Sequence, residues 1–314
     1  MAQPEFNLRD LKPLPKAPMP QATVMPAQCE PASSQGEVIY EAPRESDAIP
    51  RRRSLARSLG RALGDGLNFL SGYLLTNLTS GIAFILFRVL NRTRVHNRSN
   101  FGLARNTLIC ANHRTMIDSY MLGHLSSWPW GWLLPRVLPY HPAASENFFR
   151  NPVIGWFSAR WRCIPVRRGV KDFDALSVMS QTLPKGQMLI FPEGTRSRDG
   201  KLREGRPGTG KLIHDTRCKV VPVYHRGMHK VLPIGTSFPR FWKRIDVYVG
   251  SPIDMSDLFA LPSSKETSRL VIDRVMEALH GLEAQADADE AARVPWTVAL
   301  PRALRRALPL PYRR

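Results

Sequence analysis

The sequence has few cysteines, and none of them form a metal-binding or redox pair. Four occur in 314 residues, at Cys29, Cys110, Cys163 and Cys218, and no two are spaced as Cys-x-x-Cys. The eight histidines also lack metal-ligand spacing, so no metal site is expected. A disulfide framework is not expected either, and a reducing compartment fits this composition. The amino terminus lacks a basic start followed by an apolar core, so no signal peptide is predicted.

Acidic residues are also scarce. The chain carries 45 Lys and Arg against 26 Asp and Glu, a formal net charge of +19. Residues 1–50 hold four basic and seven acidic side chains, so the other 264 residues carry 41 basic and 19 acidic groups. A body this basic favours an anionic partner, which could be phospholipid headgroups, a phosphorylated cofactor or nucleic acid. The sequence contains no recognisable nucleic-acid-binding module, so nucleic acid is not expected.

Two different segments precede the globular part of the chain. Residues 1–50 contain nine of the 27 prolines and little apolar periodicity, which predicts a disordered tail. Residues 51–94 are expected to form a membrane-associated helical segment. Near its start, Leu55, Leu59 and Leu63 recur at every fourth position between arginines. This pattern predicts a basic amphipathic helix, which either lies on an anionic membrane or packs its leucines on the rest of the protein.

The next stretch, residues 67–87, has 21 residues without a charge. It is long enough to span a bilayer, but six Asn, Ser and Thr residues dilute its hydrophobicity. Gly72 and Gly81 could break it into two helical pieces. We therefore expect an element that dips into one leaflet from the cytoplasmic face rather than a full span. A buried core helix is the remaining alternative.

From about Val95 the pattern becomes globular, and residues 95–285 are predicted to form one α/β domain. Short apolar runs alternate with helical stretches, which favours a mostly parallel central sheet flanked by helices. Strands are predicted at residues 107–110, 131–134, 162–166, 187–191, 219–224 and 245–249. Helices are predicted at residues 173–182, 210–215 and 263–285. Residues 286–314 contain four prolines among many arginines and are predicted to be a basic tail.

The stretch TLICANHRTMIDSYML, residues 107–122, places a histidine five positions before an aspartate. On one ideal helix this spacing separates two side chains by about 140°, so a contact requires His113 to precede the helix and Asp118 to lie in its first turns. The local pattern predicts a strand, a turn and a helix capped by Asn112 or Thr115. There His113 could accept a proton while Asp118 orients its ring, although a polar turn histidine gives the same pattern.

A second constellation lies in QMLIFPEGTRSRDG, residues 187–200. An apolar strand is expected to end at Phe191, since the following proline cannot continue a central ladder. Glu193, Arg196 and Arg198 come next, in a turn and loop. α/β sheets usually place their sites at this end of their strands, and guanidinium groups bind phosphate in two-point fashion. An exposed basic hairpin is the alternative interpretation.

Four segments, in order, resemble the sequence blocks of the glycerolipid acyltransferases, the lysophosphatidate acyltransferase family. NHRTMID resembles the first block, RCIPVRRG the second, FPEGTRS the third and VVPVYHRG the fourth, and the likeness extends from about Val89 to about Leu282. After the fourth block, GMHKVLPIGTSFPRF and IDVYVGSPI look like the corresponding region of tafazzins, the cardiolipin-remodelling transacylases. The resemblance implies the glycerolipid acyltransferase fold.

The resemblance also implies a reaction. An acyl chain would pass from a thioester, acyl-CoA or acyl carrier protein, to the free hydroxyl of a lysophospholipid such as 1-acyl-glycerol-3-phosphate. No cofactor beyond the acyl donor is implied, and the expected partners are anionic membrane lipids, the lysophospholipid acceptor and acyl carrier protein where it is the donor. Two alternatives remain: a tafazzin-like transacylase that takes its acyl chain from another phospholipid without CoA, and a non-enzymatic basic protein that binds membrane surfaces.

The same resemblance assigns roles to residues on the matching positions. His113 would be the general base for the acceptor hydroxyl, and Asp118 would orient it. The residues that would bind substrate are Arg168, Glu193, Gly194, Thr195 and Arg196. Of these, the arginines would hold the acceptor phosphate, and Glu193 would either orient them or bind the acceptor. Backbone N–H groups of residues 193–195 are candidates for binding the oxyanion of the tetrahedral intermediate.

Overall fold

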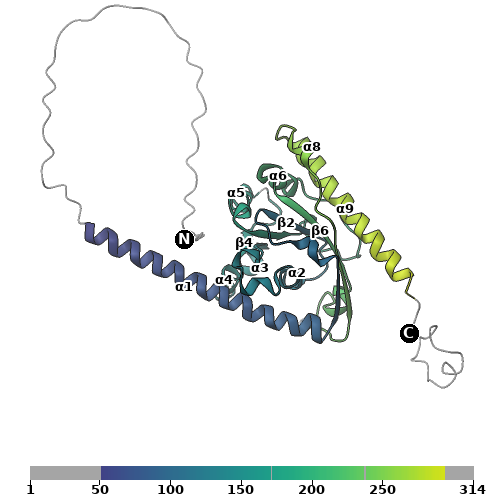
Figure 1. The fold of residues 1–314 in the computed structure, drawn as a ribbon, viewed down its shortest axis with the longest axis horizontal. Helices are drawn as coiled ribbons and strands as arrows, with labels where there is room; N and C mark the ends of the chain where they lie inside the picture. The colour runs from purple at the N-terminus through teal and green to yellow at the C-terminus, as the bar shows by residue number, and fades with distance from the viewer. Residues whose placement is uncertain (1–50, 171, 237, 294–314) are drawn as a thin grey trace, which may run out of the picture. The chain divides into compact units, whose positions relative to one another are not determined.

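The computed structural model describes residues 51–170, 172–236 and 238–293. The predicted tail over 1–50 and the last part of the predicted tail over 286–314 lie outside these ranges. Figure 1 draws the described helices and strands with the labels that are used below.

The chain divides into two units between Ser71 and Gly72, and each unit is described by itself. The first contains the amino-terminal part of α1 (Arg51–Phe84). The predicted basic helix is confirmed as a helix, and the Leu63 side chain is exposed on it. The side chains of residues 51–59 lie outside the described ones, so the leucine stripe stays a prediction.

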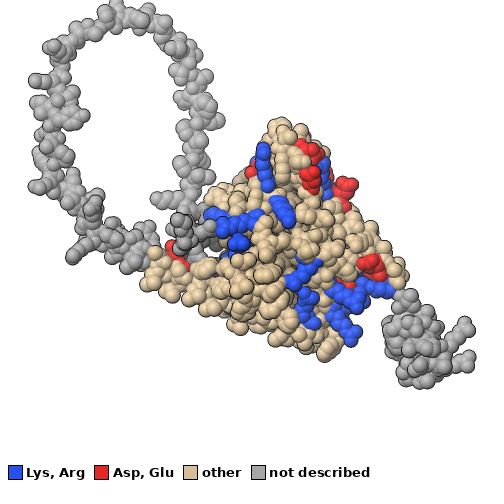
Figure 2. Space-filling model, in the orientation of Figure 1, with Lys and Arg blue, Asp and Glu red and all other residues tan. Residues whose placement is uncertain are grey.

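The second unit begins with the rest of α1, followed by the π-helical turn η3 (Ile85–Val89). The expected break at the two glycines is wrong, because α1 continues through Gly72 and Gly81. A helical glycine costs only about 1 kcal/mol, and full burial of Phe87 contributes about 1.5–3 kcal/mol. By length and composition, Ala62–Val89 could cross a membrane. In Figure 2 the surface along the second part of α1 is largely without charged side chains before the Lys and Arg groups near its carboxyl end.

A five-stranded sheet forms the centre of the second unit, in the order β1-β7-β6-β2-β5 (Figure 1). Neighbouring strands are parallel except β6 and β7, which are antiparallel. The bounds are β1 (Arg92–His96), β2 (Thr107–Ala111), β5 (Gln187–Ile190), β6 (Lys219–Arg226) and β7 (Arg244–Val249). A separate parallel pair joins β3 (His141–Ala144) and β4 (Cys163–Val166). The predicted mostly parallel sheet is confirmed.

Helices flank this sheet, and α9 packs along β6, β7 and α6. The α-helices after α1 are α2 (Asp118–Ser127), α3 (Ser145–Phe148), α4 (Pro152–Arg160), α5 (Phe173–Thr182), α6 (Pro207–Thr216), α7 (Met228–Val231), α8 (Ser256–Phe259) and α9 (Lys265–Ala291). Short 3-10 turns are η4 (Arg98–Phe101), η5 (Trp130–Trp132), η6 (Pro135–Val137) and η7 (Leu183–Lys185). α5 has the predicted bounds, whereas α9 continues past the predicted domain end at residue 285.

Three strand predictions differ from the structure. The strand expected at residues 131–134 is wrong: Leu133 and Leu134 donate backbone hydrogen bonds to Trp130, so the chain coils locally between two prolines instead of extending. β1 is not predicted from the sequence, because alternating arginines hide it and its pairing with β7 comes only from the fold. β3 is not predicted either, since its second residue is Pro142.

Glycines allow α6 to pack closely on α9. A Cβ at Gly210 would lie 1.9 Å from the backbone oxygen of Ser268, and one at Gly205 would lie 2.4 Å from Ile272 Cγ1. No side chain fits at either position without moving the backbone or the neighbouring core. Gly205 and Gly210 therefore serve the packing of α6 and the residues before it on α9.

Candidate active site

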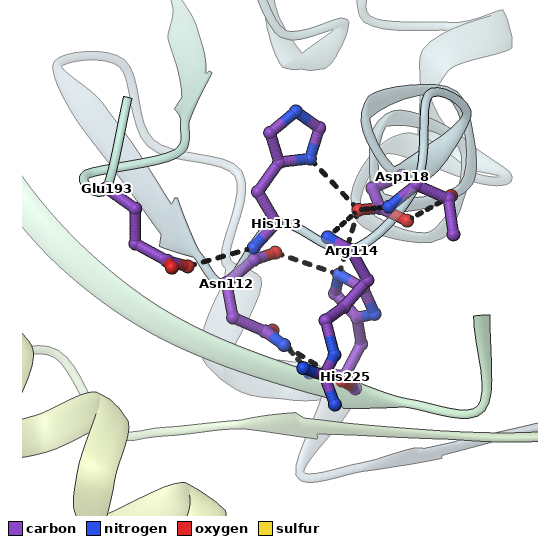
Figure 3. A network of polar contacts seen from close by, with 7 residues as sticks. Asn112, His113, Arg114, Asp118, Glu193 and His225 are labelled. Atoms are coloured by element: carbon purple, nitrogen blue, oxygen red, sulfur yellow. Dashed lines mark hydrogen bonds and ion pairs between the residues drawn. The ribbon is translucent and has the colours of Figure 1, made fainter. Parts of the chain in front are cut away.

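His113 and Asp118 meet at the carboxyl end of β2. The strand ends at Ala111, the chain turns through Asn112 and His113, and α2 begins at Asp118. His113 Nδ1 lies 3.0 Å from Asp118 Oδ2 (Figure 3). The contact joins a residue before the helix to its first residue, as the five-residue spacing requires.

The hydrogen bonds of Asp118 decide which nitrogen of His113 carries the proton. Asp118 Oδ2 also accepts the backbone N–H groups of Arg114 and Thr115, and Oδ1 accepts the Thr115 hydroxyl. A carboxylate that meets so many donors is itself the acceptor, so His113 Nδ1 donates in this pair. The Nε2 atom therefore keeps its lone pair, and in Figure 3 it points away from Asp118.

These hydrogen bonds also correct the predicted helix cap. Ile117 occupies the N-cap position of α2 without a side-chain hydrogen bond, so the predicted caps Asn112 and Thr115 are wrong. Asp118 instead reaches back to the N–H groups of the preceding turn. A carboxylate at a helix start is favoured by the helix dipole, and here it also shapes the turn that carries His113.

Asp118 is fully buried, and its neighbours keep it ionised. Burial would raise its pKa, but His225 and His113, together with hydrogen bonds from His113 and Thr115, hold the pKa of Asp118 below its usual value. A charged carboxylate at this distance stabilises the imidazolium that forms when the ring takes up a proton.

Asn112 and His225 form a three-bond pair beneath His113 (Figure 3). The Asn112 amide donates to the His225 carbonyl at 3.0 Å and accepts its backbone N–H at 2.8 Å. His225 Nε2 lies 2.9 Å from the Asn112 carbonyl and therefore carries the ring proton, since a carbonyl only accepts. Burial lowers the pKa of His225 despite Asp118, whose Oδ2 is 3.6 Å away. This neutral pair joins the ends of β2 and β6 directly before His113.

The backbone of His113 is held at two points by the loop after β5. Its N–H donates to Glu193 Oε1 at 3.1 Å, and its carbonyl accepts the N–H of Ser197 at 2.8 Å. The second oxygen of Glu193 accepts the N–H of Arg203 at 3.1 Å. Burial raises the pKa of Glu193, while these two N–H groups act to lower it. Glu193 thus fixes the turn that carries His113 against the loop after β5.

Phe191 forms one side of the His113 environment. The two rings are stacked, with centroids 3.9 Å apart and an interplanar angle of 8°. This contact restricts rotation of the imidazole, which is also tied through Nδ1. Phe191 thus leaves the ring with one orientation in which Nε2 can meet a substrate.

A cavity of about 460 Å³ lies beside the His113 ring, a volume in the range of small-molecule sites. It brings together His113, the exposed Arg168 from the loop after β4 and the half-buried Arg196 from the loop after β5. The rest of its lining is mostly uncharged and includes Thr79, Tyr120, Leu138, Ala144 and Trp161. The cavity therefore has a proton acceptor, two cations and an apolar remainder.

The other residues singled out in the sequence do not line this cavity. Glu193 is buried behind His113 and holds backbone groups. Gly194 has a φ of +70°, which favours glycine, and its N–H donates to the Phe191 carbonyl, so it is already engaged and cannot also hold an oxyanion in this conformation. Thr195 is exposed in the adjoining turn. Its role in substrate binding stays a prediction.

Sequence reasoning missed the contributions of Phe191, Asn112 and His225. Phe191 was identified only as a strand end, and Asn112 only as a helix cap. His225 lies 112 residues beyond His113 in sequence, so no local spacing connects them. Among residues 51–170, 172–236 and 238–293, no group of three potential metal ligands comes together.

Comparisons with known proteins show what the chain is similar to. Residues 92–226 match the family model described as Acyltransferase. Over 166 residues the chain is 31% identical to "Taffazin" of Dictyostelium discoideum, covering 48% of this chain and 56% of that protein. Over 129 residues it is 30% identical to the chloroplastic 1-acyl-sn-glycerol-3-phosphate acyltransferase BAT2 of Brassica napus, covering 40% and 34%. The solved structure of the 1-acyl-sn-glycerophosphate (LPA) acyltransferase PlsC from Thermotoga maritima matches with a TM-score of 0.50 and 22% identity, over 70% of this chain and 80% of that one.

Over residues 92–226 the chain is thus similar to the acyltransferase family. The predicted resemblance, including its tafazzin-like part, is confirmed by these relatives. The likeness to PlsC shows the fold. The chain spans about half the length of the Taffazin relative and a third of the plant relative.

Proposed function

We propose that this protein is a membrane-associated O-acyltransferase. It transfers a fatty acyl chain from a thioester, acyl-CoA or acyl carrier protein, to the free hydroxyl of a lysophospholipid such as 1-acyl-glycerol-3-phosphate. The observation that carries this proposal is one cavity that holds His113, Arg168 and Arg196 together. A base beside two guanidinium groups suits an acceptor that has both a hydroxyl and a phosphate.

The chemistry needs no nucleophilic side chain. The acceptor hydroxyl attacks the thioester carbonyl carbon while its proton passes to His113 Nε2, and a tetrahedral oxyanion forms. The intermediate collapses, the carbon–sulfur bond breaks, and the leaving thiolate takes the proton from His113 as a free thiol. Asp118 holds the ring and stabilises its charged form throughout, because its oxygens stay fixed by Arg114 and Thr115.

The orientation of α1 supports association with a membrane. Polar residues of its second part face the domain: Asn77 and Ser80 are buried, and Thr79 and Ser80 line the cavity. Its opposite face exposes Leu74, Leu78 and Ile82, and η3 exposes Ile85 and Val89. A helix that turns its apolar face outward is the reverse of a soluble surface helix and suits a lipid leaflet. We place it in the cytoplasmic leaflet, where anionic lipids meet the basic chain.

Removal of the base tests the proposal. His113→Ala should lower acyl transfer to lysophosphatidate by about 10²–10⁴-fold, while circular dichroism and vesicle binding stay unchanged. His280→Ala, on the exposed part of α9, is the matched control and should retain full activity. Normal turnover by a folded His113→Ala protein would remove the general-base assignment. A lipid profile of cells that express each variant would then identify the acceptor headgroup and acyl chain.

A second candidate is a transacylase that uses another phospholipid as donor. The 31% identity to the Taffazin relative supports it. Both candidates use the same base, so His113→Ala does not separate them. An assay with lysophospholipid and vesicles, run with and without acyl-CoA or acylated acyl carrier protein, separates the two candidates. Transfer that requires the thioester supports the first candidate, and transfer without it supports the second.

A further inference from the structure

The loop between α7 and β7 exposes a group of large apolar side chains. Ile234, Phe238, Phe241 and Trp242 are all exposed, Phe238 to 84% and Trp242 to 71%. We name residues 233–236 and 238–243 the aromatic loop. Exposed apolar side chains clustered on one short segment mark an interaction surface, since isolated ones are normal but groups are not.

Backbone hydrogen bonds hold the aromatic loop in place, and one of its residues has an unusual backbone conformation. Trp242 has a φ of +62°, which a bulky residue rarely adopts. Its N–H donates to the Leu90 carbonyl at 2.7 Å, and the neighbouring Lys243 carbonyl accepts the N–H of Arg92 at 2.8 Å. Such a conformation persists where the surroundings impose it, often for function. The backbone therefore presents Trp242 to the outside instead of letting it fold onto the domain.

The aromatic loop continues the outward apolar face of α1 and η3. Leu90 and Asn91 come directly after η3, and Lys243 donates its N–H to Asn91 Oδ1 at 2.9 Å. The loop is thus tied to the end of the helix at which Ile85 and Val89 are exposed. In Figure 1 the connection between β6 and β7 lies beside that end of the helix.

Basic side chains surround this apolar surface. Arg92, Lys230 and Arg240 are exposed, and Lys243 is half-buried. Among the described residues these four have no ion-pair partner. Figure 2 shows Lys and Arg gathered at this end of α1. Aromatic groups next to unpaired cations match the interface of an anionic bilayer, where rings enter the headgroup level and cations meet phosphate.

We propose that the aromatic loop is a second contact with an anionic phospholipid leaflet, in addition to the apolar face of α1. Phe238 and Trp242 enter the headgroup region, and Arg240 and Lys243 meet lipid phosphate. Two contacts fix the tilt of the domain, which one helix cannot do. A fixed tilt would hold the cavity at the leaflet surface, where the lipid substrate lies. This purpose of the contact rests on the proposed function, whereas the contact itself does not.

Hydrogen exchange on the full chain tests the contact itself. Vesicles of phosphatidylcholine with 30% phosphatidylglycerol should slow amide exchange in the aromatic loop at least threefold, and pure phosphatidylcholine should slow it less. The exposed start of α9 around Leu270 should not change. Unchanged exchange in the loop with anionic vesicles that carry bound protein overturns the proposal. Loop protection that depends on protein concentration without vesicles would assign the surface to a second copy of the chain instead.

A double variant tests its consequence. Phe238→Ser with Trp242→Gly removes both rings and keeps the positive φ allowed, and Leu261→Ser with Leu270→Ser is a control at exposed apolar positions elsewhere. The loop variant should transfer acyl chains to vesicle-bound acceptor about tenfold more slowly, yet keep its rate with a monomeric short-chain acceptor. Equal losses with both acceptors, or no loss on vesicles, contradict the proposal. Protection of the loop in a protein that shows no acyl transfer would leave the contact standing and refute the proposed function instead.

Discussion

Replacement of the buried carboxylate by its amide separates the chemistry of the site from its architecture. In Asp118→Asn one oxygen becomes an NH₂ group. At the Oδ2 position this group would face three donors, from His113, Arg114 and Thr115. At the Oδ1 position it faces only the Thr115 hydroxyl, which can rotate to accept. The amide will therefore place its oxygen at Oδ2, and the turn and the orientation of the His113 ring will be preserved.

The expected loss lies in the reaction rather than in the fold. A neutral amide oxygen accepts the Nδ1 proton but stabilises the imidazolium far less, so kcat should fall within the range of about 10²–10⁴-fold that general-base catalysis supplies. Exchange of charged for neutral hydrogen bonds should reduce the free energy of unfolding by only about 1–2 kcal/mol. Steady-state transfer from acyl-CoA to lysophosphatidate, with urea unfolding on the same samples, measures both. Asp273→Asn, exposed on α9, is the matched control.

The pH dependence of stability gives a further check on the same variant. Because the folded state lowers the pKa of Asp118, its charge contributes stability above the unfolded pKa of about 3.9, and this is lost as the pH falls through the folded pKa. The stability difference between parent and Asp118→Asn should thus be present near neutrality and shrink in acid. Normal kcat in the variant, or a loss of activity that follows unfolding alone, would refute the reasoning.

Three further predictions concern other parts of the molecule. Arg168→Ala and Arg196→Ala should each raise the acceptor KM by about tenfold or more with a small change in kcat. The control Arg105→Ala, on an exposed loop, should change neither constant. An unaltered acceptor KM in the first two variants argues against phosphate binding in the cavity. His225→Leu leaves the Asn112 carbonyl without its donor and should lower the free energy of unfolding by about 1–3 kcal/mol. His225→Gln should recover part of that stability and part of the lost kcat, whereas equal effects of both variants would mean that His225 contributes only by packing. Gly210→Ala places a Cβ against Ser268 and should destabilise the fold by about 1–3 kcal/mol in urea unfolding, unlike Gly281→Ala, which meets open space.

The strands that the sequence predicts well are those whose burial is continuous. β2, β5 and most of β6 are apolar runs because both faces of the sheet are covered. Among the described strands β1 pairs with β7 alone, and it alternates buried and exposed side chains, so its arginines conceal it. The run at residues 131–134 has strand-forming residues but pairs with no strand in the part of the chain that the structure describes.

The candidate site divides in the same way. His113 and Asp118 are close in sequence, and their spacing alone restricts how they can meet. Arg168 and Arg196 come from different loops, and only the resemblance to a family suggested that they act together. His225 contributes through pairing of β6 with β2, which no local pattern reveals. Phe191 acts through its stacking distance, which depends on the fold.

The most direct test of the central claim is the position of one proton. Nitrogen-15 NMR of the neutral His113 ring, assigned by comparison with His113→Ala, distinguishes the two tautomers. The geometry predicts a proton on Nδ1, facing Asp118, and an unprotonated Nε2 toward the cavity. A proton found on Nε2 would leave the ring without a lone pair for the acceptor hydroxyl and would contradict the account.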